Sequence, residues 1–248
     1  AISERELVQR ELKEEIEQRR NSVRLLEEDA STTSKNHLVP IDVKAFLEMN
    51  IPPRKVILSP WLPEQGLTMI HAKRGIGKTL VALTAAYAIA TGGRIFDKWK
   101  ASTPRRVLYI DGEMPAATMQ ERLAKIAIAS DKEPPGAEYF KLITPDLQPA
   151  GIPDLASSIG QRELDRFLPD YDVLILDNLS TLVRNGAENE AESWISVQEW
   201  LLRLRKEGKS VIMIHHSGKS GGQRGTSKRE DILDTVIALK QPKDADPT

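Results

Sequence analysis

The octapeptide Ala72-Lys73-Arg74-Gly75-Ile76-Gly77-Lys78-Thr79 decides the fold of this 248-residue chain. It fits the phosphate-binding loop pattern, in which a glycine-rich turn follows a buried strand and opens a helix. Residues 66–71 before it indicate a short buried strand, and residues 80–91 after it indicate a helix that ends at two glycines. This order places the start of the helix against the phosphates of a nucleotide.

Each residue type in the loop has a chemical reason to be there. Gly75 and Gly77 can adopt backbone angles that point successive amides inward at phosphate oxygens. Lys78 supplies a positive charge for the outer phosphates, and the Thr79 hydroxyl is a ligand for Mg²⁺. The sequence therefore predicts that residues 72–79 bind ATP with Mg²⁺.

Composition limits the other possibilities. The chain is 40% hydrophobic and 29% charged, which suits one large α/β domain with an appendage. Its net charge of −1 gives no overall signal for nucleic acid, and the absence of cysteine excludes disulfides and thiolate metal sites. The longest apolar run, residues 80–90, is too short to cross a bilayer, and no secretory signal is visible. We expect a cytoplasmic protein that does not enter a membrane.

Two domains are expected, an N-terminal helical arm with its linker at 1–40 and an ATPase core at 41–248. The arm has a narrow apolar stripe on a charged helix. It can lie on its own domain or pack on a neighbouring subunit, and the sequence leaves both open. The stripe consists of Val8, Leu12, Ile16, Val23 and Leu26.

The core alternates apolar strands with helices. This pattern predicts an α/β fold with a mostly parallel sheet covered by helices on both faces. After the strand at 66–71, further strands are expected at 105–110, 138–144, 171–176, 210–214 and 234–240. Helices are expected at 41–50, 80–91, 116–129, 161–168 and 190–206.

Polar residues follow several of these strands, at the edge where parallel sheets bind ligands. Glu113 follows the second strand and is expected to orient and deprotonate an attacking water. Asp177 ends an apolar strand and is expected to hold Mg²⁺ together with Thr79. His215 and His216 follow the fifth strand, and because neighbouring strand residues point in opposite directions only one can face the nucleotide. We favour His216 as the contact to the γ-phosphate. Each of these residues could instead be an ordinary strand-end or turn residue.

Together these motifs resemble the RecA-like ATPases. Residues 72–79, 109–115, 174–177, 215–219 and 224–227 are most similar to the RepA-type hexameric replicative DNA helicases, which are ring-shaped relatives of the DnaB-type helicases. The resemblance covers about residues 46–239. It implies a RecA-like sheet with strand order 3-2-4-5-1-6, a hexameric ring with ATP between subunits, and single-stranded DNA in the channel. It also implies Glu113 as the catalytic carboxylate and His216 as the γ-phosphate sensor, with a primase or other replication protein as a partner.

The segment 217–229 is rich in glycine and basic residues. Its four positive charges, Lys219, Arg224, Lys228 and Arg229, are candidate DNA contacts, because they can neutralise backbone phosphates. A solvated basic loop is the alternative. RepA-type helicases carry an arginine finger near the next strand, but residues 235–239 contain no arginine. Arg224 and Arg229 are the nearest candidates for that role.

Three functions remain open. The first is a DNA-stimulated ATPase motor, such as a replicative helicase. The second is a RecA-like ATPase that uses nucleotide as a switch, either recombinase-like or regulatory. The third is a nucleotide-binding scaffold without hydrolysis, against which the presence of Glu113 argues.

Overall fold

The structure is a computed structural model that describes residues 38–184, 190–216 and 230–242. The chain divides into two compact units, residues 1–52 and 53–248. In the first unit the described part holds one short helix, α2 (Val43–Glu48), which is capped by Asp42, whose side chain accepts a hydrogen bond from the Ala45 amide. The predicted boundary after residue 40 stays a prediction, and the arm at 1–37 lies outside the described residues.

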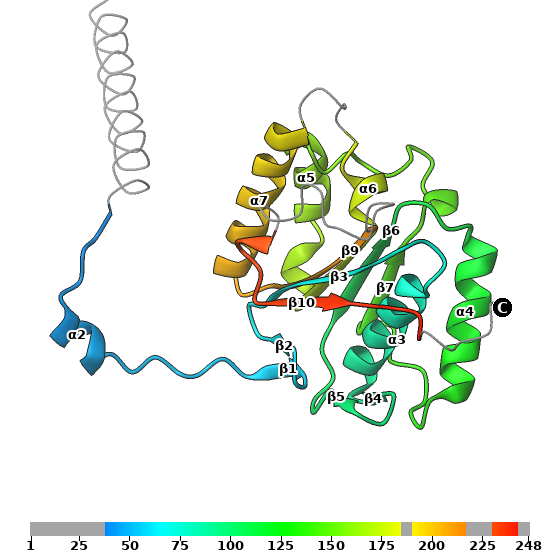
Figure 1. Ribbon diagram of the computed structural model, residues 1–248, viewed down its shortest axis with the longest axis horizontal. Helices are drawn as coiled ribbons and strands as arrows, with labels where there is room; N and C mark the ends of the chain where they lie inside the picture. Colours follow the sequence, from blue (N-terminus) through cyan, green and yellow to red (C-terminus); the bar gives the residue numbers. More distant parts are fainter. Residues whose placement is uncertain (1–37, 185–189, 217–229, 243–248) are drawn as a thin grey trace, which may run out of the picture. The chain divides into compact units, whose positions relative to one another are not determined.

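A six-stranded sheet forms the centre of the second unit, in the order β10-β3-β9-β8-β6-β7 (Figure 1). Every pair of neighbouring strands in this sheet is parallel. This order is the RecA-like order expected from the resemblance. The strands are β3 (Leu67–Ala72), β6 (Val107–Asp111), β7 (Phe140–Ile143), β8 (Val173–Asp177), β9 (Ser210–His216) and β10 (Thr235–Ala238).

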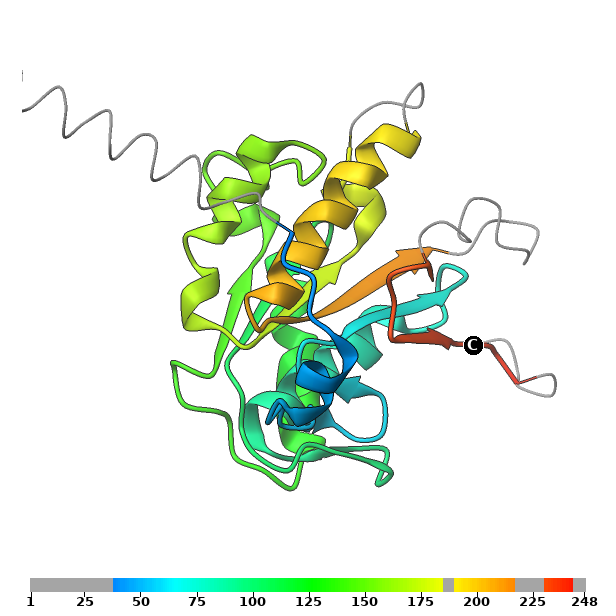
Figure 2. The same ribbon diagram turned by 90° about the vertical axis from the view of Figure 1, so that its left-hand side faces the viewer.

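Helices cover both faces of the sheet, as predicted. One face carries α3 (Lys78–Thr91) and α4 (Ala116–Ala129), and the other carries α5 (Ser158–Asp165), α6 (Leu179–Leu182) and α7 (Glu190–Lys206). Figure 2 shows these layers after a 90° turn, with α7 (yellow to orange) on one side of the strands and α3 and α4 on the other. Two short 3₁₀ turns, η1 (Pro145–Leu147) and η2 (Leu168–Asp170), complete the helical part of the unit's described residues.

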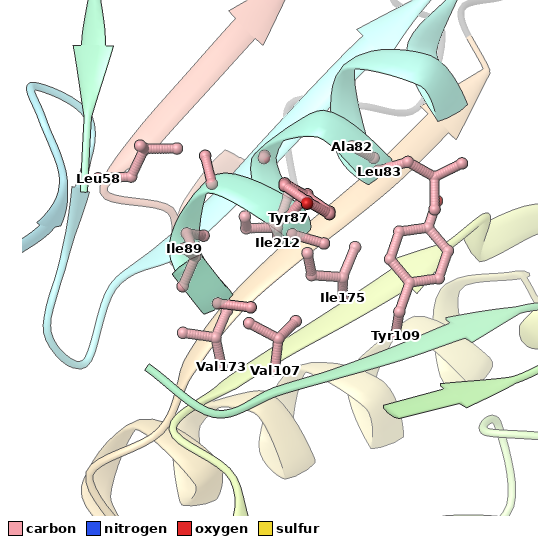
Figure 3. Close-up of a cluster of buried hydrophobic side chains, with 14 of the residues drawn as sticks. Leu58, Ala82, Leu83, Tyr87, Ile89, Val107, Tyr109, Val173, Ile175 and Ile212 are labelled. Atoms are coloured by element: carbon pink, nitrogen blue, oxygen red, sulfur yellow. The ribbon is translucent and has the colours of Figure 1, made fainter. Parts of the chain in front are cut away.

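Alternate residues of the central strands supply two separate cores. Ile175 and Ile212 pack under α3, whereas their neighbours Leu174 and Val211 pack under α7. This is the side-chain alternation expected of strands that are buried on both faces. Figure 3 shows the first core, where Leu83, Tyr87 and Ile89 of α3 lie over the strands. The cores fix the strand ends in space, and the site lies at those ends.

Several elements differ from the prediction in detail. The fifth strand reaches His216 rather than Ile214, so both histidines are strand residues. Helix α5 begins at Ser158 rather than Gln161, because the Ser157 hydroxyl accepts a hydrogen bond from the Gly160 amide. Two small antiparallel sheets were not predicted. They pair β1 (Val56–Leu58) with β2 (Leu62–Pro63) and β4 (Arg94–Ile95) with β5 (Trp99–Lys100).

Candidate active site

The phosphate-binding loop connects β3 to α3, as the sequence predicts. Gly75 and Gly77 have φ angles of 83° and 93°, a region that other residues rarely adopt. The Lys78 ammonium donates hydrogen bonds to the carbonyl oxygens of Ala72 (3.0 Å) and Lys73 (2.8 Å). The lysine side chain is therefore folded back against the loop that would hold the phosphates.

Lys78 is buried, with 5% of its surface exposed. Burial lowers the pKa of this lysine, while the negative charges of Asp177 and Glu113 raise it and Arg74 lowers it. Both carboxylates therefore lie near enough to act on the ammonium. Residues from three different strand ends meet at the loop, which is the arrangement that the strand-end motifs predict.

Asp177 is the last residue of β8 and is buried. Its carboxylate accepts a hydrogen bond from the Tyr109 hydroxyl at 2.6 Å and is also hydrogen-bonded to the Thr79 side chain. Burial raises the pKa of Asp177, and the bonds from Tyr109 and Thr79 oppose that rise. The two residues predicted to hold Mg²⁺ are thus in direct contact.

This oxygen pair fits the proposed metal. Mg²⁺ prefers oxygen ligands and is usually bound by one or two protein groups together with substrate phosphates and water. Among the described residues no group of three or more His, Asp or Glu side chains could hold a metal ion. A magnesium site at Thr79 and Asp177 would take its remaining ligands from water and from the phosphates of a nucleotide.

Glu113 lies in the turn between β6 and α4, and its side chain is exposed. The preceding Gly112 donates its amide to the Asp177 carbonyl at 2.8 Å, which joins this turn to the neighbouring strand. The negative charge of Glu113 acts on Lys78, Asp177 and His216. The structure thus brings Glu113 to the same site while leaving its carboxylate open to water.

His216 is paired in register with Ala72, the first residue of the phosphate-binding loop. Both of its ring nitrogens are buried and have no hydrogen-bond partner among the described residues. Burial lowers the pKa of His216, the charges of Lys78 and Arg74 lower it further, and Glu113 opposes them. Unsatisfied ring nitrogens beside two cations fit an anionic ligand such as a phosphate.

His215 is paired with His71 and makes other interactions within the protein. Successive strand side chains point to opposite faces, so His215 points away from the face that His216 occupies. The choice of His216 over His215 as the sensor agrees with this geometry, although the role itself stays a prediction.

Asp111, the last residue of β6, has no role in the predictions made from the sequence. It is buried with 1% of its surface exposed, and it is paired in register with Asp177. Burial raises the pKa of Asp111 to about 6, hydrogen bonds from the Met114 and Glu113 amides oppose the rise, and the charge of Asp177 adds to it. A carboxylate directly after four apolar strand residues was the available signal, because acidic side chains are rarely fully buried unless they are paired.

The candidate DNA contacts Lys219, Arg224, Lys228 and Arg229 lie outside the described residues. The structure places the two ends of their segment, at His216 of the active site and at residue 230 before β10. The two candidates for an arginine finger lie in that same segment. Within the described ranges, no helix is both long enough and apolar enough to cross a membrane.

Known proteins resemble this chain in sequence and in fold. The family described as "AAA domain" matches residues 31–222. The DNA repair protein RadA of Campylobacter jejuni is 26% identical over 186 residues, covering 73% of this chain and 35% of its own length. This chain thus spans about a third of that curated relative.

Two solved structures align with this chain. A KaiC-like protein of Pyrococcus horikoshii aligns over 78% of this chain and 84% of its own, with a TM-score of 0.52 and 13% identity. The flagellar accessory protein FlaH of Methanocaldococcus jannaschii covers 71% of this chain and 72% of its own, with a TM-score of 0.48 and 14% identity. The first likeness bears on the fold. With the family match over most of its length and the RecA-like strand order, this chain belongs to the AAA domain family and is a RecA-like P-loop ATPase.

Proposed function

We propose that this chain hydrolyses ATP and uses the energy to act on single-stranded DNA. The observation that carries the hydrolysis is the meeting of Lys78, Glu113, Asp177 and His216 at one edge of the sheet. These residues come from four different elements, and each has the chemistry that one part of phosphoryl transfer needs.

Each site residue has a distinct part in the proposed hydrolysis of ATP. Lys78 offsets the negative charge that develops on the transferred phosphoryl group, and Glu113 takes a proton from the attacking water. His216 donates a hydrogen bond to the γ-phosphate. Thr79 and Asp177 hold Mg²⁺, which supplies further positive charge to the phosphates when bound.

The DNA part of the proposal rests on the segment 217–229, which directly follows His216. A histidine that senses the γ-phosphate at the end of β9 would be covalently continuous with a basic, glycine-rich segment. Loss of the γ-phosphate would then change the position of His216, and this change would move the segment that contacts DNA. A relative that is called a DNA repair protein supports DNA as the partner. A RepA-type hexameric helicase, working with a primase or other replication protein, is the specific form that we propose.

A second candidate is a RecA-like ATPase that acts on DNA without unwinding it. The observation that favours it is the curated relative, whose name refers to repair rather than to replication. Displacement of one strand from a forked duplex separates the two candidates. The helicase proposal expects ATP-dependent displacement, and the second candidate expects DNA-stimulated ATP turnover without it.

The direct experiment measures ATP turnover with and without single-stranded DNA, together with the native mass in a nonhydrolysable ATP analogue. The proposal expects turnover that DNA increases and a mass six times that of one chain. An ATP turnover rate that DNA does not change would contradict the proposed action on DNA. A monomeric mass would contradict the proposed hexameric ring.

A further inference from the structure

We propose that Asp111 is a positioning residue that sets the direction of the Glu113 side chain. The inference rests on the proposed ATP hydrolysis, because Glu113 is the carboxylate that it would aim. Asp111 itself touches no reacting atom in this proposal.

The contacts come from one carboxylate oxygen. Asp111 Oδ2 accepts the backbone amide of Glu113 at 3.1 Å and that of Met114 at 2.5 Å. A side chain that binds the amides two and three residues later fixes a tight turn of the backbone. Glu113 is the residue in the middle of this turn, so its Cα–Cβ direction depends on the bond to Asp111.

The rest of the turn is tightly held. The amide of Gly112 bonds to the Asp177 carbonyl, and a Cβ at Gly112 would lie 2.3 Å from the Thr181 hydroxyl oxygen. Met114 is buried on the other side of Glu113. Beyond it, the Ala116 amide donates to Asp146 Oδ2 at 2.8 Å. Among these contacts, the bond to Asp111 is the one that fixes the Glu113 amide.

A carboxylate is a costly way to end a strand at this place. Asp111 is buried beside Asp177, and its second oxygen, Oδ1, has no hydrogen-bond partner among the described residues. A buried acceptor without a partner destabilises a fold. Such a cost is typical of functional sites, where local stability is given up for geometry.

The inference predicts how two substitutions differ. Asp111→Asn keeps a side-chain oxygen for both amides, so we expect ATP turnover within about threefold of wild type. Asp111→Ala removes the acceptor, and we expect kcat to fall by about ten- to a hundredfold while KM for ATP changes little, because small misplacement of a catalytic group costs factors of that size. In Glu113→Gln protein the same Asp111→Ala change should lower kcat no further, since the group it aims is already lost.

Asp172→Ala is the matched control. Asp172 also accepts a backbone amide, that of Arg106 at 2.9 Å, and it joins the same strands β6 and β8 at the opposite end from the active site. Asp172→Ala should lower the free energy of unfolding but leave kcat equal to that of wild type. An equal fall of kcat in Asp172→Ala and Asp111→Ala would mean that general stability, not positioning, explains the effect.

Amide hydrogen exchange tests the contact itself. We expect the Glu113 and Met114 amides to exchange faster in Asp111→Ala and near the wild-type rate in Asp111→Asn. This measurement separates the two claims: if wild-type protein has no ATP turnover, the proposed function fails, while the exchange rates still decide whether Asp111 holds the turn. Unchanged exchange in Asp111→Ala, or a loss of kcat in Asp111→Asn as large as in Asp111→Ala, would overturn the inference.

Discussion

At the scale of single residues, the site consists of buried ionisable groups whose contacts with one another partly offset the cost of burial. Burial shifts three pKa values in the direction that favours the neutral form of the side chain, those of Lys78, Asp177 and His216. Neighbouring charges or hydrogen bonds also raise or lower the pKa of each of these side chains. Perturbed groups that gather at one place are typical of active sites. Three predictions concern these residues.

Lys78→Ala should abolish ATP turnover and greatly weaken nucleotide binding, because the substitution removes a buried positive charge aimed at the phosphates. Calorimetric titration with an ATP analogue measures the binding. Lys98→Ala is a suitable control, since this exposed lysine lies in the turn between β4 and β5, outside the phosphate-binding loop. Equal affinity of Lys78→Ala and wild type would contradict the assignment of the phosphate site.

Nucleotide binding should depend on pH through His216. In the free protein burial and the charge of Lys78 hold the pKa of His216 below its ordinary 6.5, so the ring is neutral near pH 7. A phosphate that accepts a hydrogen bond from the ring favours the charged form and raises that pKa. The complex then binds more protons than the free protein, so affinity should increase as pH falls through the pKa of His216 in the complex.

His216→Ala should flatten this pH dependence, and His215→Ala should not. The measurement is the affinity for a nonhydrolysable ATP analogue at several pH values. Should His215→Ala remove the dependence instead, the two histidines are assigned the wrong way round.

Tyr109→Phe should weaken the use of Mg²⁺. The Tyr109 hydroxyl donates to Asp177, and this bond opposes the rise in pKa that burial causes. Loss of a group that orients a metal ligand costs about ten- to a hundredfold in metal affinity. A titration of ATP turnover against Mg²⁺ should therefore shift to higher concentrations. Tyr87→Phe is the control, because that hydroxyl bonds to the Lys132 carbonyl instead of to a site residue. Identical Mg²⁺ curves for both variants would remove Asp177 from the metal site.

At the scale of elements, the long periodic helices were predictable and the tightly packed connections were not. Helices α4 and α7 have the predicted bounds because clear apolar patterns and stop signals define them. The β4–β5 hairpin escaped prediction because its turn places Phe96 and Asp97 at positive φ, where glycine or asparagine is the usual signal. The role of Asp111 was not predicted, because its hydrogen bonds to the Glu113 and Met114 amides depend on the backbone conformation of the turn. The sequence indicates only that a strand ends at this place.

Gly160 gives an element-scale prediction. A Cβ on this residue of α5 would lie 2.0 Å from the Asp154 carbonyl oxygen, and backbone atoms cannot move aside cheaply. Gly160→Ala should therefore destabilise the fold by roughly 1–3 kcal/mol in urea unfolding, as overpacking does. Ser158→Ala, an exposed change in the same helix, should have little effect. Gly160→Ala with wild-type stability would show that α5 does not approach Asp154 this closely.

At the scale of the whole molecule, the sheet order places the site residues together although they are far apart in sequence. β3, β9, β8 and β6 are consecutive neighbours, so the ends that carry the loop, His216, Asp177 and Glu113 lie along one edge. The sequence could predict this edge from the strand-end residues and the resemblance to RecA-like ATPases. It could not predict the contacts of Asp177 with Tyr109 and Thr79, which depend on the packing of side chains between strands.

DNA binding is the prediction that belongs to the whole molecule. If Lys219 and Lys228 contact phosphates, affinity for single-stranded DNA should fall with salt, with a slope of log affinity on log salt of about 0.7 per neutralised phosphate. Replacing both lysines by alanine should reduce that slope and the DNA-stimulated turnover, with basal turnover kept. An unchanged slope in the double variant would remove the segment 217–229 from the DNA path.

The central claim, that Glu113 activates water at a phosphate-binding loop, is tested most directly by ATP turnover of Glu113→Gln beside wild type. Both proteins are first shown to bind a nonhydrolysable ATP analogue with equal affinity, so that a difference in rate reports chemistry. The account predicts that the variant hydrolyses ATP about a hundredfold more slowly or worse, the usual scale for a lost general base. Hydrolysis at the wild-type rate by Glu113→Gln would contradict the account.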